Sequence, residues 1–233
     1  MNYNIKFIKR DKLYEICEKI IKRLKKSAKS EEKDLHKNII DPFSALFDAS
    51  FNNLSISQWL NSEKIRQVQK SLQNEIGTFH QEVLGSIKDW KNLGTGEVID
   101  IVNDEKKIIA EIKNKFNTTK GNHKIAIYDD LDSLLKEKYV GYTAYYVAIL
   151  AKKKLIRSFT PSDNKTKKQR PENKRIIEID GKSFYKIVTG DDDAIYKIYK
   201  AIPDILSEIL KNDKTKIISD PLFEIIFEKA FKK

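Results

Sequence analysis

The amino-acid sequence predicts a mixed α/β (α+β) fold, in which helical N-terminal and C-terminal elaborations surround a region of β-strands. Two observations predict this fold. Apolar residues recur every three or four positions up to residue 90 and again after residue 194, which is the period of amphipathic helices. After a break at residues 92–96 the period changes to about two and β-branched residues dominate, as they do in strands.

The N-terminal region, residues 1–61, is expected to be helical. An apolar stripe predicts one helix over residues 11–27 and makes Cys17 a core residue. Asp41 followed by a proline predicts the start of a second, short helix. The core region, residues 62–233, then begins with one long helix, for which Ser62 is the expected N-cap.

The rest of the core region alternates strands and helices. The predicted elements are, in order, a hairpin of residues 98–102 and 108–113, a helix over 125–139, a buried strand over 142–150, a second hairpin of residues 176–179 and 184–188 around Asp180-Gly181, and helices over 194–210 and after Asp220-Pro221. This order places strands on both sides of a helix within one domain.

The charge balance indicates a polyanionic partner. The 233 residues include 45 Lys and Arg against 34 Asp and Glu, a net charge of +11. No apolar run approaches the ~20 residues of a membrane-spanning helix, so an integral membrane protein is excluded. The first residues lack the pattern of a secretory signal, so a cytoplasmic protein is expected. A single cysteine excludes an internal disulfide and a cysteine-rich zinc site.

The first predicted hairpin carries the residues that point to chemistry. A tight turn returns Glu111 alongside Asp100, and alternation along the strand puts Lys113 on the same face as Glu111. Two adjacent carboxylates repel each other, and a hard divalent cation such as Mg²⁺ relieves that repulsion. A lysine two residues further on can hold a metal-side water and neutralise charge on a phosphate. Glu82, late in the long helix, is a candidate further ligand, and Glu97 is a rival for the position of Asp100.

The short motif alone is weakly specific. An acidic residue two positions before a lysine occurs at least eight times in this chain. The copy at Glu111 differs because it lies in an apolar strand, follows a strand that contains Asp100, and precedes a helix and a buried strand. The alternative is an ordinary solvated sheet face in which Lys113 forms a cross-strand pair.

These residues also resemble a known family. Residues 96–103 (GEVIDIVN) and 109–121 (IAEIKNKFNTTKG) look like the type II restriction endonucleases that cut GGNCC or GGWCC sites, which carry the PD-(D/E)xK motif. The likeness extends through residues 180–185 and 189–190 and covers most of residues 75–210. The resemblance implies a restriction-endonuclease-like core, that is, a central mixed β-sheet flanked by helices.

The resemblance also implies roles and partners. Asp100 and Glu111 would bind Mg²⁺, and Lys113 would orient or activate the attacking water, so that double-stranded DNA is hydrolysed to 5′-phosphate and 3′-hydroxyl ends. A palindromic site favours a homodimer with one active site per strand, with the N-terminal helices and the Phe-rich C-terminal helix as candidate interfaces. A companion DNA methyltransferase is implied as well.

DNA contacts are expected outside the hairpin. One candidate is the polar loop after the second strand, with Asn117 and Lys120, for which a plain turn is the alternative. The other is the basic segment 158–175, where arginines can pair with guanine edges and lysines can neutralise phosphates. Its candidates are Lys165, Lys167, Lys168, Arg170 and Arg175.

Two other functions fit the same sequence. The first is a structure-specific repair or junction nuclease of the same fold, which would cut branched DNA regardless of sequence. The second is a basic DNA-binding protein without catalysis, in which the hairpin is only scaffold. Substitution of Asp100 or Lys113 separates these functions, because only an enzyme loses cleavage while it keeps binding.

Overall fold

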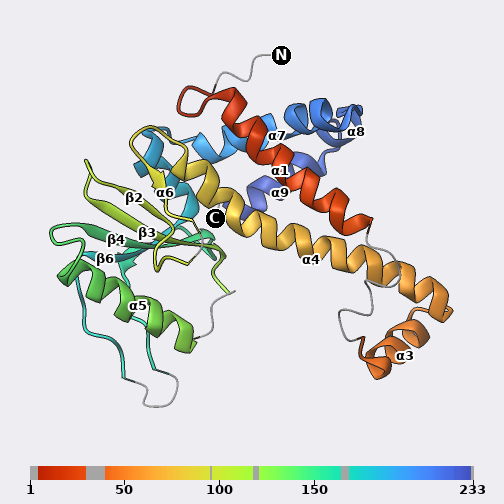
Figure 1. Cartoon of the computed structure of the whole chain (residues 1–233), viewed down its shortest axis with the longest axis horizontal. Coiled ribbons are helices and arrows are strands. Elements are labelled where there is room, and N and C mark those ends of the chain that lie inside the picture. Colours follow the sequence, from red (N-terminus) through yellow and green to blue (C-terminus); the bar gives the residue numbers. More distant parts are fainter. Residues whose placement is uncertain (1–4, 30–39, 95, 118–120, 164–167, 232–233) are drawn as a thin grey trace. The chain divides into compact units, whose positions relative to one another are not determined.

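The β-sheet of the structure has six strands and is mixed (Figure 1). This computed structural model describes residues 5–29, 40–94, 96–117, 121–163 and 168–231. In spatial order the strands are β1 (Lys91–Asn92), β2 (Ile101–Asn103), β3 (Ile108–Lys115), β4 (Thr143–Leu150), β6 (Ile176–Asp180) and β5 (Ile156–Ser158). Strands β3, β4 and β6 are parallel, whereas the other neighbouring pairs are antiparallel. The predicted mixed α/β fold is therefore confirmed.

The chain forms two units, which are described separately. The first unit comprises residues 1–16 and 77–233 and contains the whole sheet, and the second comprises residues 17–76. Two helices, α1 (Arg10–Ala28) and α4 (Ile56–Gly85), contribute residues to both units. The functional division that we expected between residues 61 and 62 stays a prediction.

Helices α5 (Gly121–Lys136) and α6 (Gly181–Thr189) cover opposite faces of the sheet. Leu131 of α5 belongs to the same buried cluster as Tyr146 of β4. Phe184 of α6 contacts Tyr145, the neighbouring residue of β4, with ring centroids 5.5 Å apart. Because successive side chains of a strand point to opposite faces, the two helices lie on opposite sides of β4. The face under α5 is also the face of Glu111, which pairs with Tyr146 in register.

The second unit begins its helices at capping residues. Helix α3 (Pro42–Phe51) starts as predicted, because the Asp41 side chain accepts a hydrogen bond from the Phe43 amide. The prediction that Ser62 caps the long helix is wrong, because α4 starts six residues earlier, at Ile56. Ser55 and Gln58 bond each other's backbone amides there, which is a capping box. The signal for this helix start is polar, and the apolar stripe of the helix does not contain it.

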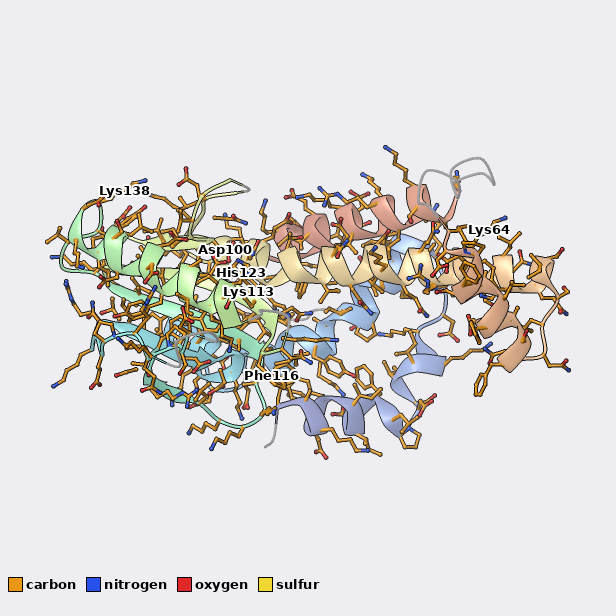
Figure 2. The ribbon with its side chains drawn as sticks, turned by 90° about the horizontal axis from the view of Figure 1, so that it is seen from below. Lys64, Asp100, Lys113, Phe116, His123 and Lys138 are labelled. Carbon is orange, nitrogen blue, oxygen red and sulfur yellow. The ribbon has the colours of Figure 1, made fainter. Side chains whose placement is uncertain are left out.

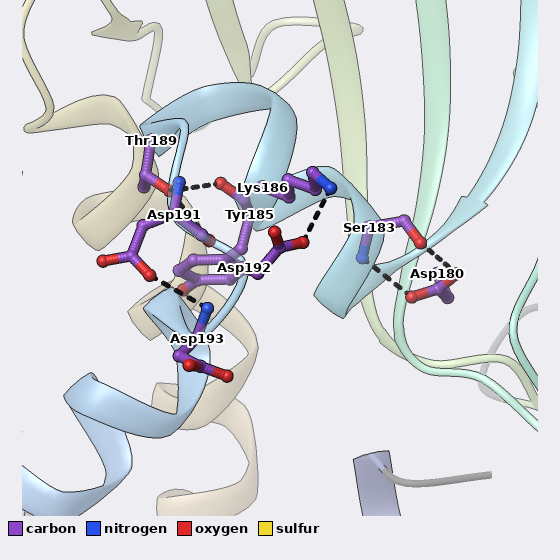
Figure 3. Close-up of polar contacts among 8 residues, drawn as sticks. All are labelled: Asp180, Ser183, Tyr185, Lys186, Thr189, Asp191, Asp192 and Asp193. Atoms are coloured by element: carbon purple, nitrogen blue, oxygen red, sulfur yellow. Dashed lines mark hydrogen bonds and ion pairs between the residues drawn. The ribbon is translucent and has the colours of Figure 1, made fainter.

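The second predicted hairpin is wrong, because only its first half is a strand. Asp180 ends β6 and caps α6 by accepting hydrogen bonds from the Ser183 amide and hydroxyl at 2.9 and 2.8 Å (Figure 3). The buried residues of α6 include Phe184, Tyr185 and Val188, at the spacing of a helix. An Asp-Gly pair suits both a tight turn and a helix start, so the pair does not decide between them. The antiparallel partner of β6 is instead the short strand β5.

The C-terminal helices form an aromatic contact of their own. They are α7 (Ala194–Leu210), α8 (Thr215–Ile218) and α9 (Leu222–Phe231). Tyr199 of α7 stacks on Phe223 of α9 at 4.6 Å between ring centroids, and Phe227 lies beside the same tyrosine. Phe223 and Phe227 are both buried, so this face of α9 is used within the chain. None of the helices in the described ranges combines the length and the apolar character that crossing a bilayer requires.

His80 couples the stability of the first unit to pH. Its imidazole Nδ1 lies 2.8 Å from the Tyr185 hydroxyl, and burial lowers the pKa of His80 from 6.5 to about 4. The unfolded chain therefore binds more protons than the folded chain below pH 6.5, and stability that is present above pH 6.5 is lost as the pH falls towards 4. We expect the free energy of unfolding to fall by about 2 kcal/mol between pH 7.5 and pH 5 from this residue.

Urea unfolding at several pH values, followed by circular dichroism, measures this loss. His80→Gln serves as the control, because glutamine does not titrate. The difference in unfolding free energy between His80→Gln and the unmodified protein should shrink as the pH falls. A difference that stays constant from pH 7.5 to pH 5 would exclude His80 as the titrating group.

Candidate active site

The hairpin of β2 and β3 brings Asp100 and Glu111 together. Ile101 pairs with Ala110 in antiparallel register, and the Asp100 amide donates to the Ala110 carbonyl at 2.9 Å. Asp100 therefore lies beside Glu111, one position beyond the paired residues. Alternation along β3 puts Lys113 on the face of Glu111, and the ammonium of Lys113 forms an ion pair with the Glu111 carboxylate. The juxtaposition expected from the spacing is confirmed, and the roles of the three residues stay a prediction.

Backbone and helix contacts fix Asp100 in this position. The Ile112 amide donates a hydrogen bond to Asp100 Oδ2 at 2.5 Å. The Asp100 side chain is also hydrogen-bonded to the Glu111 carboxyl group and to the Gln81 amide of α4. Gln81 was missed in the sequence, because a glutamine within a helix carries no signal of such a contact. Figure 2 shows Asp100 and Lys113 in the same part of the first unit.

Burial controls the charge of the two carboxyl groups. It raises the pKa of Asp100 above 3.8, although the Ile112 amide and the charge of Lys113 act in the opposite direction. Burial and then the neighbouring Asp100 charge raise the pKa of Glu111 to about 7, while Lys113 opposes this shift. Burial thus favours the protonated form of both carboxyl groups, and the repulsion between the two negative charges adds to this effect at Glu111.

This pair is a suitable donor set for a hard divalent cation. Carboxylate oxygens are the ligands that Mg²⁺ prefers, and a cation between Asp100 and Glu111 would neutralise the repulsion between the two carboxylates. Across the described ranges, no group of three or more His, Cys, Asp or Glu side chains is arranged to hold a metal ion. The structure thus offers two carboxylates and does not group Glu82 with them. Glu82 follows Gln81 on α4, and its role as a further ligand stays a prediction.

The predicted DNA-contacting residues have different environments. Asn117 lies two residues beyond the end of β3 and is exposed, as are Lys168 and Arg175. Arg170 is paired with Asp129 of α5 through two hydrogen bonds of 2.7 and 2.6 Å. Lys120, Lys165 and Lys167 lie outside the described residues. This pairing occupies Nε and one Nη of Arg170, so a two-bond contact of these nitrogens with a base requires that the pair with Asp129 open.

The basic segment is folded back on itself and anchored to α5. Ser162 and Gln169 form an antiparallel bridge on either side of residues 164–167. The Tyr128 hydroxyl donates to the Pro171 carbonyl at 2.6 Å, and Asn173 donates to Asp132 at 2.9 Å. The prediction of an exposed segment holds for several of its residues, such as Lys168 and Arg175, whereas Arg170, Pro171 and Asn173 are held against α5.

A second charged cluster on the same sheet face was missed. Glu178 of β6 is buried, and its carboxylate accepts two hydrogen bonds from Arg157 of β5 at 2.9 and 2.7 Å. Lys124 of α5 lies 3.7 Å from the same carboxylate. One signal was available in the sequence, because Glu178 interrupts an apolar run of residues in the same way as Asp100 does. The cluster needs three distant segments, and the sequence gives no indication that they meet.

Comparison with known proteins identifies relatives over most of the chain. A family model described as the Eco47II restriction endonuclease matches residues 5–211. The type II restriction enzyme Eco47II of Escherichia coli is 39% identical over 211 residues, which covers 88% of this chain and 88% of that enzyme. The type II restriction enzyme Sau96I of Staphylococcus aureus is 34% identical over 236 aligned positions, which cover 98% of this chain and 90% of that enzyme.

Proposed function

The chain belongs to the Eco47II restriction endonuclease family and is a site-specific endonuclease, and from this premise we propose that it hydrolyses double-stranded DNA in a Mg²⁺-dependent reaction at Asp100, Glu111 and Lys113. The observation that carries the proposal is the contact of the buried Glu111 carboxyl group with the half-buried Asp100 carboxyl group and with the ammonium of Lys113. A pair of carboxyl groups whose pKa values are raised by burial and, at Glu111, also by the neighbouring carboxylate is typical of catalytic sites.

The three residues have separate tasks in the proposed reaction. Asp100 and Glu111 hold the cation, which when bound supplies positive charge to the phosphate oxygens and lowers the pKa of a bound water. Lys113 lies at the edge of the site, with 26% of its side chain exposed, where its ammonium can orient that water and neutralise a phosphate oxygen. The water oxygen loses a proton to solvent as it attacks phosphorus in line with the leaving group, the P–O3′ bond breaks, and the leaving 3′ oxygen takes up a proton from solvent. The products are 5′-phosphate and 3′-hydroxyl ends.

We place the recognition of DNA in the basic segment and in the loop after β3. The proposed site is of the GGNCC/GGWCC type, as the resemblance implies. Arg175 can donate two hydrogen bonds to a guanine edge, and so can Arg170 once it is released from Asp129. Asn117, Lys120, Lys165, Lys167 and Lys168 are proposed to contact the backbone. A companion methyltransferase would protect the same site in the cell.

A palindromic site presents the same sequence on both strands. A two-fold symmetric homodimer would place one active site at each strand, and we propose this assembly. The Phe-rich face of α9 supports this interface poorly, because Phe223 and Phe227 are buried within the chain. Helix α3 supports it better, since Phe43, Phe47 and Phe51 are 71%, 78% and 89% exposed. An aromatic side chain has a surface of about 150–250 Å², so the three phenylalanines together expose about 500 Å² of apolar surface that a dimer interface could bury. Sedimentation of the protein at twice 27.1 kDa would support the dimer.

Digestion of unmethylated plasmid DNA, with Mg²⁺ or with EDTA, tests the proposed function. We expect discrete linear fragments that share one terminal sequence, and only with Mg²⁺. Nicked circles would contradict the dimer, because a single active site cuts one strand at a time. A smear would indicate a structure-specific or nonspecific nuclease. No cleavage, together with tight DNA binding, would indicate a binding protein without catalysis.

A further inference from the structure

The charged cluster formed by Lys124, Arg157 and Glu178 has no part in the reaction described above. Its members come from α5, β5 and β6, and all three meet at one carboxylate. Glu178 contributes one negative charge and the two cations contribute two positive charges, so the cluster carries a net charge of +1. A structural ion pair with Glu178 needs only one cation. The second cation of the cluster is therefore available to another anion.

The cluster lies in the same row of the sheet as the catalytic glutamate. Glu111 pairs with Tyr146 across β3 and β4, and Tyr146 pairs with Glu178 across β4 and β6. Residues that pair in register on neighbouring strands point to the same face, so Glu111 and Glu178 share the face under α5. Two strand spacings separate them, which is about 10 Å. The ammonium of Lys124 lies over the intervening residue, 5.5 Å from the centre of the Tyr146 ring.

The contacts leave both cations capable of binding a further anion. Arg157 uses its Nε and one Nη to hold Glu178, and 66% of its side chain is exposed. Lys124 is less exposed, at 25%, and is held at 3.7 Å from Glu178. A guanidinium has five N–H donors and an ammonium has three, so donors remain on both residues. Because Glu178 is buried and fixes both side chains, little conformational entropy is lost when they bind a ligand.

We infer that Lys124 and Arg157, held by Glu178, bind a backbone phosphate of the DNA that flanks the phosphate cleaved at Lys113. The inference rests on the proposed function, since it places this phosphate relative to the catalytic residues. A phosphodiester is a monoanion with two free oxygens, which matches the single unbalanced positive charge and the two adjacent donors. Lys124 and Arg157 are positioning residues, because they would set the position of the strand and do not touch the reacting atoms.

The test measures duplex binding by fluorescence anisotropy in EDTA, over a series of salt concentrations. Lys124→Gln and Arg157→Gln are each expected to weaken binding about tenfold, equally for duplexes with and without the cleavage site. The slope of log Kd against log salt concentration should fall by about 0.9, since one phosphate contact is lost. A merely structural role would not change this slope. Thermal unfolding of both variants confirms that they are folded.

Lys138→Gln is the matched control. Lys138 also lies over a tyrosine ring, that of Tyr139, at 5.3 Å, but it lies beyond the other end of α5 (Figure 2). The variant should bind duplex DNA with unchanged affinity and slope. Folded variants at Lys124 and Arg157 that keep the slope of the unmodified protein would overturn the inference. If the unmodified protein itself neither binds nor cuts duplex DNA, the proposed function fails first, and the two failures are therefore distinguishable.

Discussion

Lys113→Ala is expected to lower the rate of DNA cleavage about 10³-fold while duplex binding changes by only a few-fold. The ammonium of Lys113 is the cation in contact with Glu111, and its loss removes positive charge at the point where a phosphate oxygen and the attacking water would lie. Binding depends instead on the many basic residues of a chain with a net charge of +11, so one lysine contributes little to it. Single-turnover cleavage of a mapped plasmid site and anisotropy in EDTA measure the two effects separately.

Lys91→Ala is the matched control for this prediction. Asp89 and Lys91 have the same spacing as Glu111 and Lys113, but Lys91 lies on the edge strand β1 and pairs with the exposed Asp104. An exposed ion pair contributes at most about 1 kcal/mol, so this variant should fold and cut at the rate of the unmodified protein. Cleavage by Lys113→Ala within threefold of the unmodified rate would show that Lys113 has no catalytic role.

Gly181→Ala is expected to lower the free energy of unfolding by about 3 kcal/mol. A Cβ atom at this position would lie 2.6 Å from the Cα and the carbonyl oxygen of Ile149, both of which belong to the backbone of β4. Neither atom can rotate away, so α6 and β4 would have to separate. That separation would disturb the contact of Phe184 with Tyr145 in the core. Urea unfolding monitored by circular dichroism measures the loss.

Gly77→Ala provides the comparison for this glycine. Gly77 lies within α4, and a Cβ atom there would meet nothing within 4 Å. Alanine is the better helix former by about 1 kcal/mol, so this variant should be slightly more stable than the unmodified protein. Equal free energies of unfolding for the two glycine variants would show that the close approach to Ile149 does not destabilise Gly181→Ala.

The elements that were predicted correctly are those whose signal is local. The hairpin of β2 and β3 lies within 15 residues, and its alternation, turn and paired carboxylates all occur in one stretch of sequence. Asp100, Glu111 and Lys113 were brought together correctly for the same reason. Register follows from the alternation once the turn is short.

The features that were missed depend on distant partners. The identity of α6 is decided by Ile149 and by the burial of Phe184, which the short apolar stretch after Gly181 does not reveal. Lys124 and Glu178 are 54 positions apart and meet only because α5 lies over β4 and β6. Such contacts are set by the packing of layers, and periodicity within one element does not specify which residues of another element it meets.

The short outer strands have a consequence for colloidal behaviour. The sheet ends in β1, which has two residues, and in β5, which has three. Long unpaired edges can recruit strands from other molecules and start fibrillar assembly, whereas short edges with cations resist it. Lys91 and Arg157 lie on these two strands and are both exposed. The sheet is thereby protected from edge-to-edge aggregation at the concentrations at which the protein would be purified and assayed.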